Sequence, residues 1–505
     1  METGKTTTHR FPSSMLSLGS VNRCLSSSLP PEILSSIFEM VYVELCCDYG
    51  YEDELEWEEA EDDELAELSV FPNALSRVCR YWDAVLATFP EFWTRIVVHP
   101  DQPYHIELLK AALKRSDPHK IHSLTIIQSV EGQGVNDGQE RDKMIKVLKV
   151  AEEEVFRIKA LTIKTYTSDS LPRIPFDWDA LGSLRFESFH RGDHALGPHP
   201  SIHDPSDETV DWKNLCVLSL TGPAFVTLSR GASWQKAVSS KTLDSLTISR
   251  LRARDGGEKP FTFHELWASY RAFFIVGHLT LMDVDVPYVP GGWEEHETPS
   301  CHCYSLSSAY TFDAIPARVL RAFYHDIEEL ARSRWNKWSR SYSSSPPYPD
   351  VDQMIFRNCQ FFGFQKDDRT LSSNVVEVAD ITHSDSLSIC FEMVEAQELR
   401  IRNCLGLDDS SIEAMTLPLR KQEQRPALRD MYGLEIVNCP KFSIASLREL
   451  VERRKEISEY NNLDQEERVS PIARLVLRGS CPLVSDEDEK WFRENVEDFE
   501  IDREA

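Results

Sequence analysis

A group of histidines and carboxylates between residues 190 and 204 has the residue types that bind zinc. Its members are His190, Asp193, His194, His199, His203 and Asp204. Pro198, Pro200 and Pro205 interrupt this stretch, so these side chains cannot share one face of a helix. Loop histidines without a rigid set of supporting hydrogen bonds rarely hold a metal. We therefore interpret the stretch as a solvated polar loop and predict no metal site.

Three further motifs resemble cofactor or phosphate sites but lack the required spacing or context. Gly132, Gly134 and Gly138 have a third glycine one residue late for a dinucleotide-binding turn, and no acidic residue closes the next strand-like segment. Cys301-His302-Cys303 has no partner pair at zinc-ligand spacing, and Gly4-Lys5-Thr6 has no upstream strand. Because no nucleophile elbow, metalloprotease helix or complete phosphate loop is present either, we predict no catalytic residue, no cofactor and no enzymatic activity.

The charge and the cysteines narrow the classes of partner and compartment. The chain of 505 residues carries 55 basic and 83 acidic side chains, for a formal net charge of −28, which repels nucleic acids and anionic membranes. The longest largely apolar run, Ala272 to Met282, is too short to cross a bilayer, and no secretory signal is visible. The cysteines are spread over the whole chain, which is more typical of buried small hydrophobic residues than of a disulfide framework. This pattern indicates a reducing compartment. We expect a soluble cytoplasmic or nuclear protein with no nucleic-acid or membrane partner.

The elements predicted before residue 98 are helices. Residues 1–27 are rich in Ser and Thr and are expected to be disordered, and Pro30 and Pro31 then mark a helix start. The apolar residues that follow share one helical stripe: Leu29, Ile33, Leu34, Ile37, Phe38 and Val41. A second helix is predicted from about Asn73 to Pro90, with one stripe of Leu75, Val78, Cys79, Trp82, Val85 and Leu86. Residues 28–98 are therefore predicted to form a small helical unit that Trp93 and Ile96 help to close.

Three motifs in this unit carry a family resemblance. They are Leu29-Pro30-Pro31-Glu32-Ile33-Leu34, Leu75-Ser76-Arg77-Val78-Cys79-Arg80-Tyr81-Trp82 and Phe89-Pro90-Glu91-Phe92-Trp93. In order and residue type they resemble an F-box-like domain of the kind abundant in mushroom-forming fungi. The resemblance implies that the opening helix docks on a Skp-type adaptor and, through it, on a cullin-based ubiquitin ligase. The alternative from spacing alone is that both stripes are inward faces of a helical bundle.

The resemblance also implies which residues contact the adaptor. By position they are Leu29, Pro30, Ile33, Leu34, Ile37, Phe38, Val78, Cys79 and Trp82, in a helix-in-groove mode. An acidic insert at residues 49–68 departs from the compact F-box pattern, because it holds many Asp and Glu and no Lys or Arg between Tyr49 and Leu68. Self-repulsion favours a solvated loop there. A helix laid across the docking face would instead prevent adaptor binding.

From about residue 105 the chain repeats a short strand-like phrase of apolar, polar and apolar residues. The phrases begin at Leu124, Leu161, Leu218, Leu246, Leu279, Leu399, Leu434 and Leu475. Such repetition predicts a solenoid, because one strand and one helix cannot bury their apolar faces alone, whereas stacked neighbours can. Variable intervals and the Pro-, Gly- and Ser-rich stretches 288–311 and 339–350 indicate long loops or insertions.

The later repeats resemble the cysteine-type leucine-rich repeat. Asn403-Cys404 and Asn438-Cys439 follow their strands, with Asn358-Cys359 and Ser480-Cys481 as variants. We expect the asparagine to satisfy backbone groups of the turn and the cysteine to fill a narrow interior, so neither needs a reactive role. Apolar residues at matching offsets after Cys404 and Cys439 predict an inward-facing helix in each repeat. They are Leu407, Ile412 and Met415 in one repeat and Phe442, Leu447 and Leu450 in the other.

These patterns combine into one prediction of fold class and function. We expect an α+β or α/β chain in which a small helical F-box-like module precedes an irregular leucine-rich-repeat-like solenoid at residues 105–484. Residues 485–505, acidic with Trp491 and Phe492, are expected to cap the array with a short helix or to form a tail. The function expected is substrate recognition for a Skp-cullin-F-box ubiquitin ligase. The alternative is a repeat-based interaction scaffold without a link to ubiquitin.

Overall fold

The computed structural model describes residues 29–47, 71–127, 137–167, 180–190, 214–230, 238, 241–257, 259–288, 307–325, 351–364, 371–420, 428–459 and 469–502. Its contacts divide the chain into two compact units. The amino-terminal unit comprises Met1–Val97 and Ala112–His119, and the sheet unit comprises Val98–Ala111 and Lys120–Ala505.

Most described elements of the amino-terminal unit are helical. They are α1 (Pro31–Cys47), α3 (Asn73–Ser76), α4 (Arg80–Leu86) and the 3-10 turn η3 (Pro90–Trp93), before β1 (Arg95–Val98). The rings of Phe71 and Phe92 meet at 5.4 Å and those of Tyr42 and Phe92 at 5.0 Å. The buried indole of Trp93 donates a hydrogen bond to the carbonyl of Leu86 at 3.1 Å. Aromatic packing therefore supplies much of this small core.

The single helix predicted from Asn73 to Pro90 is wrong, because two short helices occupy this stretch. Cys79 adopts extended backbone angles, φ −163° and ψ 162°, between the end of α3 and the start of α4. The second helix also ends at Leu86, and Pro90 opens η3 instead of stopping a long helix. The apolar spacing runs on through both helices, so periodicity could not reveal the break at Cys79.

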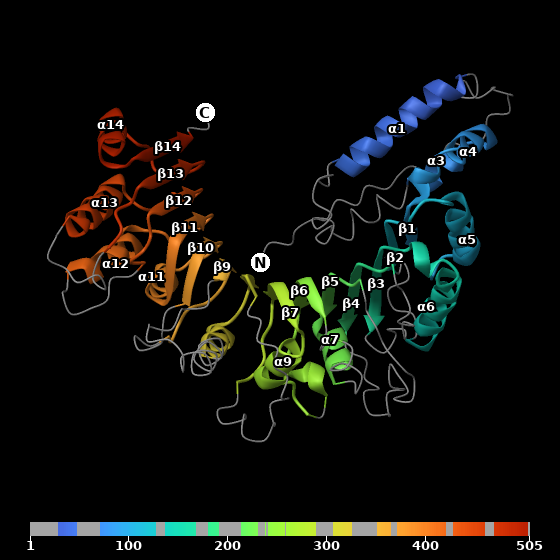
Figure 1. Cartoon of the computed structure of the whole chain (residues 1–505), viewed down its shortest axis with the longest axis horizontal. Coiled ribbons are helices and arrows are strands. Elements are labelled where there is room, and N and C mark those ends of the chain that lie inside the picture. Colours follow the sequence, from blue (N-terminus) through green and yellow to red (C-terminus); the bar gives the residue numbers. More distant parts are fainter. Residues whose placement is uncertain are drawn as a thin grey trace, which may run out of the picture. The chain divides into compact units, whose positions relative to one another are not determined.

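The dominant element is one open sheet with fourteen strands that follow one another in chain order (Figure 1). Every neighbouring pair from β2 to β14 is parallel. The strands after β1 are β2 (Ser123–Ile127), β3 (Ala160–Thr167), β4 (Ser183–His190), β5 (Val217–Thr221), β6 (Thr242–Ser249), β7 (Ile275–Met282), β8 (Ala309–Asp313), β9 (Val351–Arg357), β10 (Leu371–Ala379), β11 (Val394–Arg402), β12 (Gly433–Val437), β13 (Arg474–Arg478) and β14 (Asp498–Asp502). This order gives the mixed α/β solenoid-like arrangement that the repeats predicted.

Strand register confirms the repeated phrase. One row of buried side chains, one from each strand, runs in register from β2 to β14. Its members are Leu124, Leu161, Leu184, Leu218, Leu246, Leu279, Tyr310, Met354, Val376, Leu399, Leu434, Leu475 and Phe499. Every strand phrase predicted from the sequence supplies a member of this row. The strands β4, β8, β9, β10 and β14 supply the members that the sequence prediction missed.

Each strand from β6 to β13 ends in the same turn. The residue after the strand has a positive φ, between 48° and 63°, at Arg250, Asp283, Ala314, Asn358, Asp380, Asn403, Asn438 and Gly479. From Arg250 to Asn438, the N–H of this residue donates to the last carbonyl of the next strand at 2.7–3.0 Å. We call this row of hydrogen bonds the turn ladder. It satisfies backbone groups at the point where the chain leaves the sheet.

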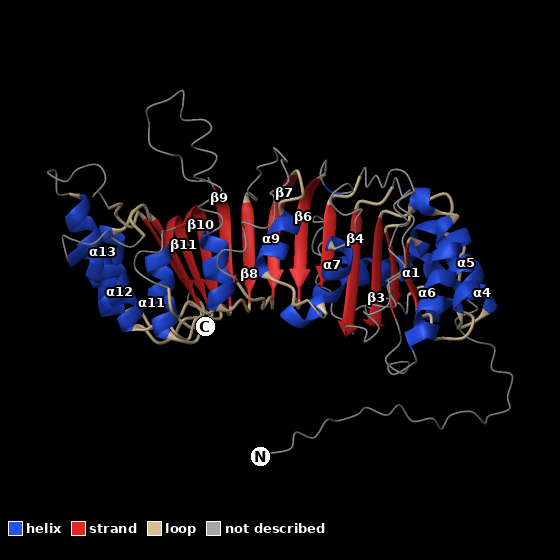
Figure 2. Ribbon diagram, turned by 90° about the horizontal axis from the view of Figure 1, so that it is seen from below, coloured by secondary structure: helices blue, strands red, loops and turns tan. Residues whose placement is uncertain are grey.

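Helices or 3-10 turns follow many of the strands, and strands and helices form separate layers (Figure 2). The α-helices are α5 (His105–Arg115), α6 (Asp137–Glu152), α7 (Gly222–Ser229), α9 (Phe263–Tyr270), α11 (Ser384–Met393), α12 (Asp409–Arg420), α13 (Ile444–Ser458) and α14 (Asp486–Asn495), and two 3-10 turns are η5 (Val155–Arg157) and η7 (Ala253–Gly256). The predicted inward residues Leu407, Ile412, Leu447 and Leu450 are buried. At the end of the array, residues 486–502 form α14 and also a further strand, β14.

Candidate functional site

The start of α1 is set by its two prolines. Pro31 is the first helical residue, where the N–H that proline lacks would have no partner within the helix. The carbonyl of Pro30 accepts hydrogen bonds from the N–H groups of Ile33 and Leu34, both at 3.1 Å. The hydroxyl of Tyr81 in α4 donates to the carbonyl of Leu29 at 2.8 Å. These bonds tie the beginning of α1 to α4.

The inner face of α1 packs against the rest of the amino-terminal unit. Leu34 and Phe38 are each 1% exposed, and the rings of Phe38 and Trp82 meet edge to face at 5.3 Å. One turn later, Tyr42 contacts Phe71 and Phe92. This face therefore fixes α1 in place.

The outer face of α1 is also apolar but is left exposed. Ile33 is 49% exposed, Met40 63% and Val43 46%, and Ile37 lies half-buried between Ile33 and Met40 in the helical sequence. Spacings of four and three residues place Ile33, Ile37 and Met40 on one stripe. We call these three residues with Val43 the outer stripe. Glu32 and Glu39 are exposed on the same helix.

The structure separates the residues predicted to contact an adaptor into two groups. Leu34 and Phe38 are interior residues, so in this arrangement they position α1 and cannot touch a partner. Pro30, Ile33 and Val78 are exposed, and Leu29, Ile37, Cys79 and Trp82 are half-buried. Adaptor docking itself stays a prediction, now resting on the exposed group.

Sequence reasoning missed Met40 and Val43. Because α1 is apolar around most of its circumference, Leu34 and Ile33 fit the same broad stripe, and spacing alone could not show which half faces inward. The sequence did contain one indication of the outer stripe, because Met40 follows Ile33 and Ile37 at helical spacing.

The asparagine and cysteine positions have the structural role predicted for them. The Asn438 side chain donates to Oδ1 of Asn403 at 3.1 Å and accepts from the N–H of Ser480 at 3.0 Å. Cys359, Cys404 and Cys439 are buried. Burial raises the pKa of the Cys359 thiol to about 12, and a hydrogen bond with Cys404 followed by burial raises the pKa of Cys439. Thiols held protonated in this way are poor nucleophiles.

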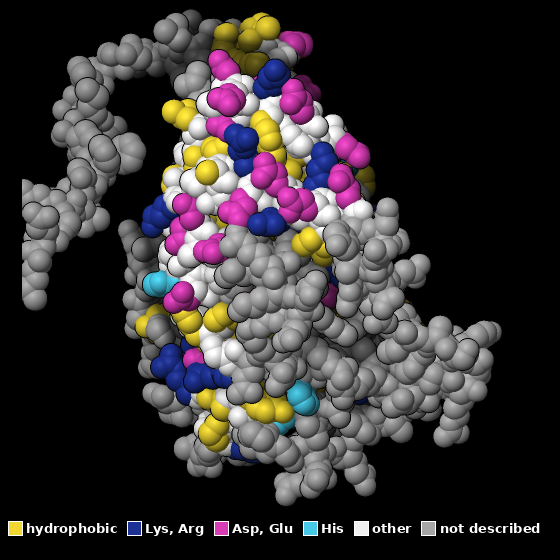
Figure 3. Space-filling model, turned by 90° about the vertical axis from the view of Figure 1, so that its left-hand side faces the viewer, with side chains coloured by type: hydrophobic (Ala, Val, Ile, Leu, Met, Phe, Trp, Pro, Cys, Tyr) yellow, Lys and Arg dark blue, Asp and Glu magenta, His cyan; other side chains and the backbone are white. Residues whose placement is uncertain are grey.

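The face of the sheet opposite the buried row carries a network of ion pairs. N–O distances of 3.1–3.9 Å link charged residues within or between the strands β9 to β14, and one pair, Arg474 with Glu398, joins β13 to β11 across β12. The members of this charge lattice are Arg357, Glu377, Glu398, Arg400, Arg402, Glu435, Arg474, Arg478, Asp498 and Glu500. Figure 3 likewise shows acidic and basic side chains interspersed at this end of the molecule. Because each arginine lies beside a carboxylate, the lattice does not mark an anion site.

Several sequence motifs lie outside the described residues: residues 191–204 of the histidine group, Gly132 and Gly134, Cys301-His302-Cys303, Gly4-Lys5-Thr6 and the whole acidic insert, residues 49–68. His190 lies in β4 and Gly138 in α6, but the side chain of His190 is also outside the description. Within the described ranges, no group of His, Cys, Asp and Glu has an arrangement that could hold a metal ion. The helices in those ranges also include none with the length and apolar content of a membrane span.

No protein-family model matches the chain, and no curated protein matches it at a significant level.

Proposed function

We propose that this protein is a protein-binding adaptor whose amino-terminal unit docks on a Skp-type subunit of a cullin-based ubiquitin ligase. The observation that carries the proposal is the outer stripe, an exposed apolar face on a helix whose opposite face is already buried against α4 and η3. An exposed apolar stripe of this kind is suited to helix-in-groove docking. The F-box-like motifs around Leu29, Val78 and Trp93 favour the same reading.

The sheet unit would then present a second protein to the ligase. Stacked repeats offer a long continuous surface, which suits recognition of a protein better than of a small molecule. In this proposal the ubiquitin-transfer chemistry belongs to the partners, and this chain contributes binding only.

The test is co-purification of the full chain with a Skp-type subunit. The variant Ile33→Asp with Met40→Asp places two charges on the outer stripe while leaving Leu34 and Phe38 in the core. We expect at least about tenfold weaker binding, because both carboxylates would be desolvated in the interface. A matched control, Phe156→Asp with Tyr432→Asp, puts the same charges on exposed apolar positions of the sheet unit and should bind like wild type.

Circular dichroism must first show that both variants remain folded. Loss of binding in the outer-stripe variant alone would support docking through α1. If the wild-type chain does not bind the Skp-type subunit, the ligase proposal fails, and the interaction scaffold without ubiquitin becomes the better account.

A further inference from the structure

The last strand of the sheet has an open edge. Among the described strands, β14 pairs with β13 on one side and has no neighbour on the other. The N–H of Asp498 donates to the carbonyl of Ala473 at 2.9 Å. Because alternate residues of a parallel strand point their backbone groups to opposite sides, those of Phe499 and Ile501 face the open edge. This edge can therefore accept an additional strand.

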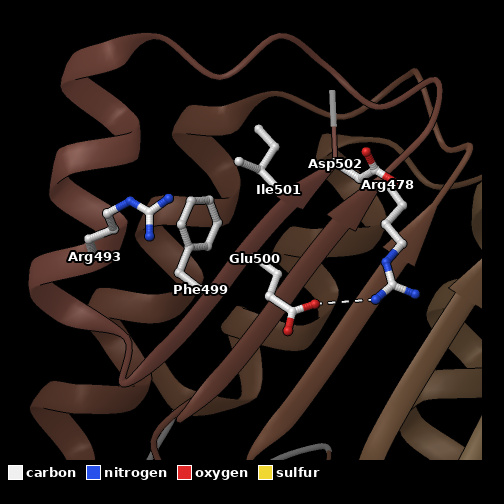
Figure 4. A pocket seen from close by; sticks show the side chains of 6 residues that line it. All are labelled: Arg478, Arg493, Phe499, Glu500, Ile501 and Asp502. Carbon is white, nitrogen blue, oxygen red and sulfur yellow. Dashed lines mark hydrogen bonds and ion pairs between the residues drawn. The ribbon is translucent and has the colours of Figure 1, made fainter. Parts of the chain in front are cut away.

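A hollow lies beside this edge. It has a volume of about 510 Å³ and is lined by Arg478, Arg493, Phe499, Glu500, Ile501 and Asp502 (Figure 4). The Phe499 ring stacks on Phe492 of α14 at 5.1 Å, and the guanidinium of Arg493 lies 5.8 Å from the centre of the Phe499 ring. Ile501 is only half-buried. The inward side of an added strand would thus meet the half-buried Ile501 beside the almost fully buried Phe499, with Arg493 at the border.

The outward side of an added strand would meet acidic groups. In the charge lattice, β12 contributes Glu435, and β13 contributes Arg474 and Arg478. The side chains of β14 on this face are Asp498, Glu500 and Asp502, and all are exposed. On this face the side chains of β12, β13 and β14 are therefore acidic, basic and acidic in turn. An added strand with basic side chains would continue this alternation of charge.

We infer that the open edge of β14 binds an extended peptide that alternates basic with apolar residues, by adding a strand to the sheet. Its basic side chains pair with Asp498, Glu500 and Asp502, and its apolar side chains pack on Ile501 beside the buried Phe499. A β14 strand from a second copy does not fit, because its acidic side chains would face these same carboxylates. The inference concerns the sheet unit alone and does not depend on adaptor docking by α1.

The test uses a labelled synthetic peptide that alternates lysine with valine, and fluorescence anisotropy with the full chain. A peptide that alternates glutamate with valine is the charge control and should not bind. Two further lysine–valine peptides carry N-methyl groups on either all lysines or all valines. Strand addition predicts that one of these loses binding and the other keeps it, because only alternate N–H groups of the peptide face β14.

Two protein variants and one matched control variant complete the experiment. Ile501→Pro removes an N–H that faces the open edge and spares the bonds to β13, so binding should weaken about tenfold or more. Asp502→Lys should also weaken it, whereas Glu494→Lys, an equal charge change at an exposed position of α14, should not. The inference is overturned if the lysine–valine peptide does not bind, if both methylated peptides still bind, or if folded Ile501→Pro binds like wild type. The role left for Asp498, Glu500 and Asp502 would then be to prevent, by charge repulsion, the pairing of β14 edges from different copies.

Discussion

Arg454 shows how strongly one side chain can matter in this array. It is 0% exposed and donates to the carbonyls of Leu428, Arg429, Met431 and Ser470 at 2.9–3.1 Å. Burial lowers its pKa to about 10, so the guanidinium is still charged at neutral pH. One residue of α13 thereby holds the segments that lead into β12 and β13.

Replacing Arg454 with methionine should destabilise the protein by about 3–5 kcal/mol, because buried carbonyls would lose a charged donor. The neighbouring Arg453 is the matched control, since it is 45% exposed and pairs with Glu456 at 3.0 Å. Arg453→Met should change stability by less than about 0.5 kcal/mol. Urea unfolding of both variants measures the difference, and equal midpoints would contradict the structural role of Arg454.

At the same scale, the sequence could indicate which α1 residues are apolar candidates for docking. It could not show which of them face the core and which face solvent. Ile33 and Leu34 are adjacent, similar in type and compatible with one broad stripe, yet one is 49% exposed and the other 1%. Their division depends on where Trp82 and Phe92 lie, which is a property of the folded unit. Arg454 was missed for a related reason, because a single arginine in a charged helix gives no sign of burial.

At the scale of elements, the turn that ends each strand from β6 to β13 requires a backbone conformation that most residues avoid. Gly479 has φ 63°, and a Cβ placed there would lie 2.0 Å from Oδ1 of Asn438, which the N–H of Ser480 already holds. Gly479→Ala should therefore cost about 1–3 kcal/mol.

Gly182→Ala is the control for this prediction, because a Cβ there would meet its nearest atom at an ordinary 3.8 Å. It should change stability by less than about 1 kcal/mol. Thermal unfolding monitored by circular dichroism compares the two variants. A Gly479→Ala melting curve that overlays that of Gly182→Ala would show that the turn tolerates a side chain.

The elements that the sequence predicted well are those whose signal is local. The strand phrases at Leu399 and Leu434 carry their own apolar alternation and their own Asn-Cys turn. Strand β14 has the alternation but not the Asn-Cys turn: Asp498–Asp502 alternates acidic with apolar residues within an acidic segment. It is a strand because β13 offers a partner edge and α14 offers Phe492, neither of which the local sequence reveals.

At the scale of the whole molecule, the sheet unit is a chain of nearest-neighbour contacts. Among the described strands, each one from β2 to β13 has a neighbour on both sides, whereas β14 has one. Such arrays open from their ends, because a terminal repeat loses only one interface.

Native-state hydrogen exchange should therefore show that amides of β14 exchange about tenfold or more faster than those of β11. Peptic fragments that cover 498–502 and 394–402 give the comparison by mass spectrometry. Uniform protection across both fragments would mean that the sheet unit opens as a single cooperative block.

The turn ladder also governs how such a chain can change in length during evolution. A residue added between a strand and its turn would move one turn N–H away from the carbonyl that accepts from it. The neighbouring hydrogen bonds of the turn ladder would then also be misaligned. A residue added after the helix, before the next strand, disturbs none of these hydrogen bonds. The uneven repeat lengths of this sequence can therefore accumulate between one turn and the next strand, and this is where a new recognition loop or an engineered epitope can be inserted.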